Sequence, residues 1–315
     1  MQIAVGAEIN EDRLETLRNR FPDVTFGAVG DEPGIMRDAD AYIGRIGPNA
    51  YASAGDRLRW VHSTGAGVET ILAIPGVVES GIVVTNTRGA HAPFVAEHAF
   101  ALMLSLVRCL PEYGQDQQDH IFRSFGRGVA MDSLYGKRIL VIGMGNIGTA
   151  VARRALGFEM HVIGLDLRVP DVISGETPIL SIEHLDHELP RADVVVVTVP
   201  RTVETEGMLD ARRIGLLKDG AIVIGVSRGR IIDEEALATR LREGSLAGAG
   251  LDVFSEEPLP SDHFLWDTPR LVMTPHAAPN SPSTRDREFE ITVENIRRFV
   301  ADEPLLNVCD KVAGF

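Results

Sequence analysis

Three polar residues of this 315-residue sequence, Arg228, Glu257 and His276, each follow a short apolar run. An arginine can bind a carboxylate and polarise a carbonyl, and a histidine can donate or accept a proton. A carboxylate beside the histidine favours the imidazolium form, which keeps a proton ready to donate. The residue types therefore predict that Arg228, Glu257 and His276 form the catalytic set of an enzyme.

A glycine motif marks a second site. Gly143, Gly145 and Gly148 have G-x-G-x-x-G spacing directly after an apolar run and directly before a helical pattern. The first glycine allows a tight turn, the second lets the backbone approach a pyrophosphate, and the third permits close helix–strand packing. The helix N-terminus adds N–H donors. We therefore predict a dinucleotide cofactor bound by these glycines and by Asn146 and Ile147.

The choice of dinucleotide depends on Asp166, which ends the next apolar run. A carboxylate there can accept hydrogen bonds from the adenosine ribose and repels the 2′-phosphate of NADP. NAD(H) is therefore favoured. Arg168 lies two residues further on and could reach that phosphate, so NADP(H) stays open.

Together the two sites suit hydride transfer to a 2-oxo acid, which needs a hydride at C2, a proton for the developing alkoxide and a cation for the carboxylate. From about Val61 onward, the segments around Arg228, Glu257 and His276 resemble the D-isomer-specific 2-hydroxyacid dehydrogenase family. That family includes glyoxylate/hydroxypyruvate reductases and phosphoglycerate dehydrogenases. The resemblance implies an NAD-dependent oxidoreductase that acts on the CH–OH group of 2-hydroxy acids, with His276 as acid/base.

The resemblance also implies further contacts. The glycine-containing stretch 63–69 is similar to the family loop whose backbone N–H groups bind the substrate carboxylate, which assigns Ala66 and Gly67 to the substrate together with Arg228 and His276. Asp252 looks like the residue that accepts from the nicotinamide carboxamide. Additional cofactor contacts are expected at Thr198, Pro200 and Ser227.

The elements that must position these residues are parallel strands. Short apolar runs alternate with helix-sized segments, and a Val-rich run such as 194–199 suits a strand buried on both faces of a parallel sheet. Ligands bind at the carboxyl edge of such sheets, so distant segments can converge there. We expect an α/β fold of two Rossmann-like or flavodoxin-like doubly wound domains, with the active-site cleft between them.

Domain limits follow from the same pattern. Residues 1–90 are expected to form the first part of a substrate-binding domain, residues 91–280 an NAD-binding Rossmann domain, and residues 281–315 a C-terminal helical segment that returns to the first domain. A helix over 93–110 would link the domains. His91, at its start, could either line the crevice or cap that helix.

Composition excludes several other classes. The net charge of −14 repels nucleic acid and anionic membranes, and no apolar run approaches the length of a membrane span, so a cytoplasmic protein is expected. Cys109 and Cys309 lie far apart and are expected to be buried apolar residues rather than a disulfide. The stretch 183–188 is rich in His, Asp and Glu but lacks supporting ligands, so no metal is expected.

One function of another class stays open, namely a dinucleotide-sensing protein like the corepressors that share this fold. A homodimer is implied by the resemblance, with the helix over 93–110 as an interface element. The identity of the 2-oxo acid is left open, because its selection depends on loops of the poorly matched first domain.

Overall fold

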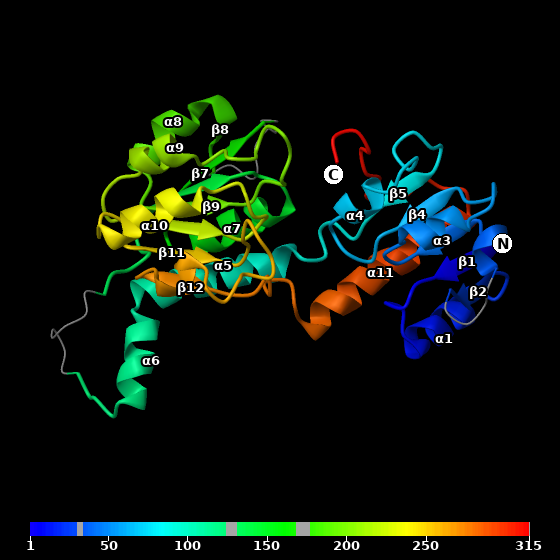
Figure 1. Ribbon diagram of the computed structural model, residues 1–315, viewed down its shortest axis with the longest axis horizontal. Helices are drawn as coiled ribbons and strands as arrows, with labels where there is room; N and C mark the ends of the chain where they lie inside the picture. The colour runs from blue at the N-terminus through cyan, green and yellow to red at the C-terminus, as the bar shows by residue number, and fades with distance from the viewer. Residues whose placement is uncertain (30–33, 124–130, 168–176, 315) are drawn as a thin grey trace. The chain divides into compact units, whose positions relative to one another are not determined.

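The computed structural model describes residues 1–29, 34–123, 131–167 and 177–314. The chain divides into two compact units: unit 1 is Met1–His91 with Ser281–Phe315, and unit 2 is Ala92–Asn280 (Figure 1). The first division lies one residue from the expected limit, and the second coincides with it. Unit 1 is therefore built from two separate stretches of sequence.

Unit 1 contains a five-stranded parallel sheet in the order β2-β1-β3-β4-β5. Neighbouring residues of β1 face opposite sides, so that Ile3 joins one apolar core and Ala4 the other. On the Ile3 side, the closing helix contributes Phe289 and Ile296 to the core. The elements are β1 (Gln2–Val5), α1 (Glu11–Arg20), β2 (Thr25–Ala28), α2 (Ile35–Asp38), β3 (Ala41–Ile43), α3 (Pro48–Ala52), β4 (Trp60–His62), α4 (Glu69–Leu72), β5 (Val83–Thr85) and α11 (Pro282–Val300).

Unit 2 contains a seven-stranded parallel sheet in the order β12-β11-β10-β9-β6-β7-β8. Val194 and Val196 of the central strand pack on one face with α5 and α7, and Val195 and Val197 pack on the other with α8, α9 and α10. The elements are α5 (Ala92–Val107), α6 (Leu110–Gln118), β6 (Arg138–Ile142), α7 (Asn146–Gly157), β7 (His161–Asp166), β8 (Ile179–Ser181), the 3-10 turn η1 (Ile182–His184), α8 (Leu185–Glu188), η2 (Leu189–Arg191), β9 (Val194–Val197), α9 (Ala211–Leu216), β10 (Ile222–Gly225), α10 (Glu234–Arg242), β11 (Gly248–Leu251), η3 (Phe264–Asp267) and β12 (Leu271–Met273).

The prediction of two α/β units with parallel sheets is confirmed. The closing helix α11 also begins where it was expected, since the Ser281 side chain accepts a hydrogen bond from the Thr284 N–H and Pro282 occupies the first turn. Both cysteines are buried, as predicted.

The linking helix differs from the prediction. It ends at Val107 instead of continuing to residue 110, because Cys109 has a left-handed backbone (φ 54°) that an α-helix does not allow. The following helix, α6, was not predicted, and its axis is bent by 66° from α5. Figure 1 shows α6 extending away from the sheet of its unit. Among the described residues no single helix has both the length and the apolar character to cross a membrane, although the bent pair α5 and α6 would pass by length and composition together.

Two of the three carboxylates in the acidic and histidine-rich stretch of residues 183–188 form ion pairs. Asp186 lies 2.8 Å from the guanidinium groups of both Arg212 and Arg213, and Glu188 lies 2.5 Å from that of Arg138. The hydrogen bond from Arg213 is the main cause that lowers the pKa of Asp186. These contacts fix α8 against β6 and α9.

A buried histidine connects β4 to α11 inside unit 1. His62 Nδ1 lies 2.8 Å from Thr85 Oγ1, which also accepts from Trp60 Nε1, and His62 Nε2 lies 3.0 Å from Thr292 Oγ1. Thr292 donates its hydroxyl hydrogen to the Glu288 carbonyl, so Nε2 must donate to Thr292 and Thr85 must donate to Nδ1. Burial lowers the pKa of His62 to about 3, and the ring is neutral in the folded protein.

The buried His62 gives the folded state a specific acid sensitivity. Below the unfolded pKa near 6.5 the unfolded chain binds a proton at this ring and the folded chain does not, so the free energy of unfolding falls by about 1.4 kcal/mol per pH unit toward pH 4. In the variant His62→Gln this contribution is lost, and the stability difference from the wild type shrinks as the pH falls. Urea unfolding at pH 7, 6 and 5, followed by the fluorescence of buried Trp60, measures it. His161→Gln, at an exposed histidine, is the control. If the free energy of unfolding changed with pH equally in the wild type and in His62→Gln, the role of His62 in acid sensitivity would be contradicted.

Candidate active site

The glycine loop between β6 and α7 has the geometry of a phosphate cradle. Gly143 has φ 95°, and a Cβ added to Gly148 would lie 1.9 Å from the Gly143 carbonyl oxygen, so both positions require glycine. A Cβ at Gly145 would meet no described atom within 4 Å. Gly145 is the N-cap of α7, and among the described residues no side chain caps this helix. The backbone is therefore open to an anion at the positive end of α7.

Other predicted cofactor contacts lie at or just after the ends of strands β7, β9 and β10, at the same edge of the sheet as this loop. Asp166 Oδ2 accepts from the Met144 N–H at 2.6 Å, which holds the carboxylate against the glycine loop. Thr198 Oγ1 donates to the Gly143 carbonyl at 2.6 Å, and Pro200 follows two residues later. Ser227 Oγ is buried and lacks a hydrogen-bond partner within the described ranges, as expected of a group that faces a ligand. These residues fit a dinucleotide, whereas Arg168 lies outside the described residues.

The segment after β10 packs directly on the segment after β11. A Cβ at Gly229 would lie 1.8 Å from the Phe254 carbonyl oxygen, so this glycine allows the two backbones to touch. Arg230 Nε donates to the Ser255 carbonyl at 3.2 Å. Arg228 Nη1 donates to the Ser227 carbonyl at 2.9 Å. The predicted arginine is therefore presented by a turn that the Phe254–Ser255 backbone supports.

Glu257 and His276 form a direct pair. Glu257 Oε1 accepts from the Phe254 N–H at 2.9 Å, which fixes the carboxylate. Its other oxygen, Oε2, lies 2.8 Å from His276 Nδ1. With Nδ1 directed at the carboxylate, Nε2 is the ring atom that can exchange a proton with a ligand. The side chains of His276 and Glu257 are 40% and 36% exposed, so a small molecule can reach them.

Asp252, expected only as a cofactor contact, also accepts hydrogen bonds from the loop that carries His276. Its side chain is 1% exposed, and Oδ1 and Oδ2 accept from the N–H groups of Ala277 and Ala278 at 2.8 and 3.0 Å. Its carbonyl oxygen accepts from the His276 N–H at 2.8 Å. No local pattern indicates this role, because the three donors lie more than 20 residues away along the chain.

In unit 1, three carbonyl groups at the centre of the predicted substrate loop accept hydrogen bonds. Ser63 Oγ donates to the Gly67 carbonyl at 3.1 Å, Asn86 Nδ2 donates to the Ala66 carbonyl at 2.7 Å, and the Thr87 N–H donates to that of Gly65 at 3.2 Å. Hydrogen bonds to these three carbonyl groups thus hold the loop in its conformation.

His91, whose role the sequence left open, lies beside α11 in the same unit. Its Nε2 is 2.5 Å from Glu288 Oε1, and both side chains are largely buried. This pairing between the end of the first stretch of unit 1 and the second stretch was not among the two roles considered.

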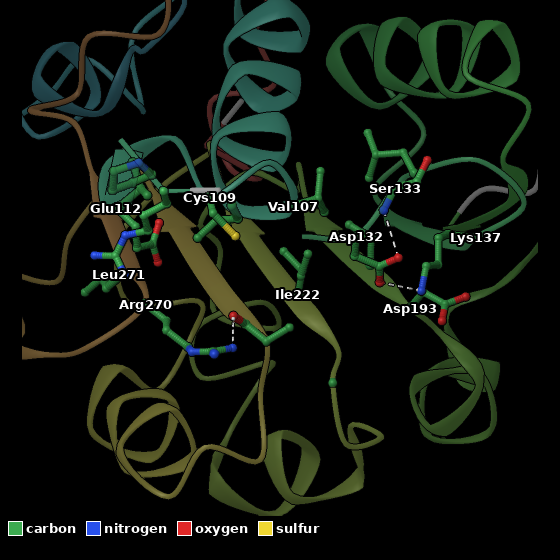
Figure 2. Close-up of a pocket in the computed structure, with 18 residues that line it drawn as sticks. Val107, Cys109, Glu112, Asp132, Ser133, Lys137, Asp193, Ile222, Arg270 and Leu271 are labelled. Carbon is green, nitrogen blue, oxygen red and sulfur yellow. Dashed lines mark hydrogen bonds and ion pairs between the residues drawn. The ribbon is translucent and has the colours of Figure 1, made fainter. Parts of the chain in front are cut away.

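A cavity of about 590 Å³ in unit 2 lies elsewhere (Figure 2). It is lined by residues at or just before the starts of strands, including Lys137, Asp193, Ile222 and Leu271, and Cys109 also faces it. The residues predicted to be catalytic follow the ends of strands β10, β11 and β12, so this cavity lies at the opposite edge of the sheet from them. It is not part of the candidate active site.

Comparison with known proteins agrees with this geometry. The model of the family "D-isomer specific 2-hydroxyacid dehydrogenase, NAD binding domain" matches residues 100–278. A glyoxylate reductase of Korarchaeum cryptofilum is 34% identical over 85% of this chain and 82% of its own length. The chain spans only 50% to 59% of the length of the D-3-phosphoglycerate dehydrogenases that it matches, which are longer proteins.

Solved structures of proteins from the same family are also similar to this chain. A D-isomer specific 2-hydroxyacid dehydrogenase family protein from Aeromonas salmonicida has 31% identity and a TM-score of 0.85, covering 98% of this chain and 99% of its own. An NADPH-dependent glyoxylate/hydroxypyruvate reductase of Sinorhizobium meliloti, solved with NADP and sulfate, has 26% identity and a TM-score of 0.83, covering 100% and 99%. The corepressor-like alternative receives no support from these relatives.

The glycine loop generates a paired prediction. Gly145→Ala places its methyl group in open space, so we expect an unchanged melting temperature but a Kd for NADH that rises by roughly ten-fold, since the methyl group keeps the pyrophosphate from the backbone. Gly148→Ala must displace the Gly143 carbonyl and should lower both the melting temperature and cofactor affinity. Thermal unfolding and NADH fluorescence titration measure the two quantities. Wild-type NADH affinity in Gly145→Ala would show that the pyrophosphate does not approach this backbone.

Proposed function

The chain belongs to the D-isomer specific 2-hydroxyacid dehydrogenase family and is an NAD(P)-dependent oxidoreductase, and from this we propose that Arg228, Glu257 and His276 reduce a small 2-oxo acid to its D-2-hydroxy acid. The observation that carries the proposal is the 2.8 Å contact between His276 Nδ1 and Glu257 Oε2, on segments that follow adjacent strands. Because Nδ1 faces the carboxylate, Nε2 is left as the ring atom for acid/base catalysis.

His276 acts on the oxygen at C2. In the direction of reduction its Nε2–H donates the proton that the developing alkoxide requires, and in oxidation the same atom removes the proton from the hydroxyl. Glu257 stabilises the charged imidazolium, because the Phe254 N–H holds one carboxylate oxygen and leaves the other directed at the ring.

Arg228 supplies the cation that a protein with net charge −14 must place locally to bind an anion. Its guanidinium binds the substrate carboxylate and polarises the C2 carbonyl. Ala66 and Gly67, in unit 1, stay expected substrate contacts on the strength of the family resemblance, and the dinucleotide is assigned to unit 2.

The residues that would hold the dinucleotide are the glycine loop, the first turn of α7 and Asp166, together with Thr198, Pro200, Ser227 and Asp252. NADH, when bound, supplies the hydride that reduces C2. Asp166 favours NAD(H), since its carboxylate, fixed by the Met144 N–H, would repel a 2′-phosphate. NADP(H) is bound by a relative, so it remains the second cofactor to test.

Glyoxylate and hydroxypyruvate are the first substrates to test, because relatives carry those activities in their names. The homodimer is also part of this proposal. Most apolar residues of α5 are buried within unit 2, but Leu110, Phe122 and Tyr135 beyond it are exposed, which favours a contact there with a second copy. The cytoplasmic location and the absence of nucleic acid and membrane partners stay predictions from charge and composition.

The catalytic assignment predicts the effect of two substitutions. His276→Ala removes the proton donor and should lower kcat by roughly 10³-fold, and Arg228→Ala should lower kcat and raise the KM for the oxo acid, while NADH binding survives in both. The measurement is loss of NADH absorbance with glyoxylate, hydroxypyruvate and pyruvate. Glu257→Gln keeps the acceptor for the Phe254 N–H and removes only charge, so it is the matched variant for His276 pairing. Wild-type kcat in His276→Ala would refute the role of this residue.

The proposed role of Asp166 predicts that its carboxylate makes the enzyme prefer NADH to NADPH. Asp166→Asn keeps an acceptor for the Met144 N–H but removes the negative charge, so the ratio of kcat/KM for NADH to that for NADPH should fall by roughly ten-fold. Steady-state assays with both cofactors measure the ratio. An unchanged ratio would mean that another residue selects the cofactor.

The dimer predicts a molecular mass of about 68 kDa, twice the chain mass of 34.2 kDa, by light scattering coupled to size exclusion. Leu110→Asp should produce the monomer, because it places a charge on the exposed apolar surface while an acidic residue still suits the start of α6. Val203→Asp, at a residue that is exposed elsewhere in unit 2, is the control. A wild-type mass of one chain at micromolar concentration would rule the dimer out.

A further inference from the structure

A hydrogen-bonded chain connects helix α5 to the loop that carries His276. His98 Nε2 on α5 lies 2.8 Å from Thr274 Oγ1, and Thr274 Oγ1 lies 2.6 Å from Asp252 Oδ1. An ionised carboxylate only accepts, so Thr274 must give its single hydroxyl hydrogen to Asp252. His98 must then donate its Nε2–H to Thr274. The direction of every bond in this chain is therefore fixed.

The chain ends on the residue that orders the catalytic loop. The N–H groups of His276, Ala277 and Ala278 all bond to Asp252, at its carbonyl oxygen, Oδ1 and Oδ2 respectively. Pro275, directly before them, has no N–H to contribute. The conformation of this loop thus depends on one buried aspartate and on what orients its carboxylate.

His276 needs this support because its backbone is strained. Its φ of 51° lies in the left-handed region, which is unfavourable for a residue other than glycine. In this backbone conformation the imidazole ring of His276 is directed toward Glu257 Oε2. If the Asp252 carboxylate turned, its bonds from the Ala277 and Ala278 N–H groups would weaken together, and the strained residue before them could relax.

We propose that His98 is a positioning residue for the reaction: through Thr274 and Asp252 it holds the His276 loop in the conformation that keeps the imidazole paired with Glu257. This rests on the proposed function of His276 as acid/base. His98 also lies 3.5 Å from Asp252 Oδ1, and its side chain is 22% exposed, so it closes the Thr274 side of the carboxylate. No contact of His98 with substrate or cofactor is required.

The test compares substitutions that remove the donor with substitutions that restore it. His98→Leu removes the Nε2–H, whereas His98→Gln can place an amide N–H at the position of Nε2. Thr274→Val removes the hydroxyl with little change of shape, whereas Thr274→Ser keeps it. His161→Leu makes the same change at an exposed histidine of unit 2 and serves as control.

For His98→Leu and Thr274→Val we expect kcat for the oxo acid to fall by roughly ten-fold, the effect of one lost hydrogen bond, while its KM changes by less than about two-fold. His98→Gln and Thr274→Ser should recover most of the activity. Wild-type kcat in His98→Leu and in Thr274→Val would overturn the proposal. An equal loss in His98→Leu and His98→Gln would also overturn it, since packing rather than donation would then be responsible.

A second measurement tests the positioning role of His98 independently of the acid/base role of His276. Hydrogen exchange of the Ala277 and Ala278 amides, followed by mass spectrometry, should become roughly ten-fold faster in His98→Leu and Thr274→Val, while exchange in the glycine loop stays unchanged. This result does not depend on turnover. If exchange accelerates but His276→Ala retains activity, the positioning chain stands and the acid/base assignment fails. If exchange is unchanged, the chain does not hold the loop.

Discussion

All strands of the seven-stranded sheet run in the same direction, so the segments that follow β10, β11 and β12 must start at one edge. This constraint brings Arg228, Glu257 and His276 near one another although 48 residues separate the first from the last. Glycines then allow contacts that side chains would block, as Gly229 does against Phe254. The sheet provides the approximate position, and single hydrogen bonds provide the final orientation.

Much of this arrangement could be predicted from the sequence. Val- and Ile-rich runs reveal buried parallel strands, and the G-x-G-x-x-G spacing reveals the turn between β6 and α7, because each depends on local stereochemistry. The closing helical segment was also expected, and the Ser281 cap and the first-turn Pro282 that start it are local features of the same kind. The pairing of Glu257 with His276 came from a family resemblance, and the two side chains do lie together.

Other features could not be read from the sequence because they arise between distant segments. The contact of His98 with Thr274 spans 176 residues, and a threonine before a proline looks like an ordinary strand end. The break between α5 and α6 depends on the left-handed backbone of Cys109, a residue type with no strong tendency toward it. Likewise, the pairing of His91 with Glu288 depends on how α11 packs against the rest of unit 1.

The two-part construction of unit 1 has a consequence for how the protein is made. Its first 91 residues leave the ribosome long before α11, whose Phe289, Val293 and Ile296 complete the core around Trp60. At typical rates of synthesis, the roughly 190 intervening residues take about 10 to 40 seconds. During that time unit 2, which is continuous, can fold alone, while the N-terminal sheet, covered on this face by α1, lacks the part of its core that α11 supplies. The nascent chain would therefore offer chaperones one specific surface for one limited interval.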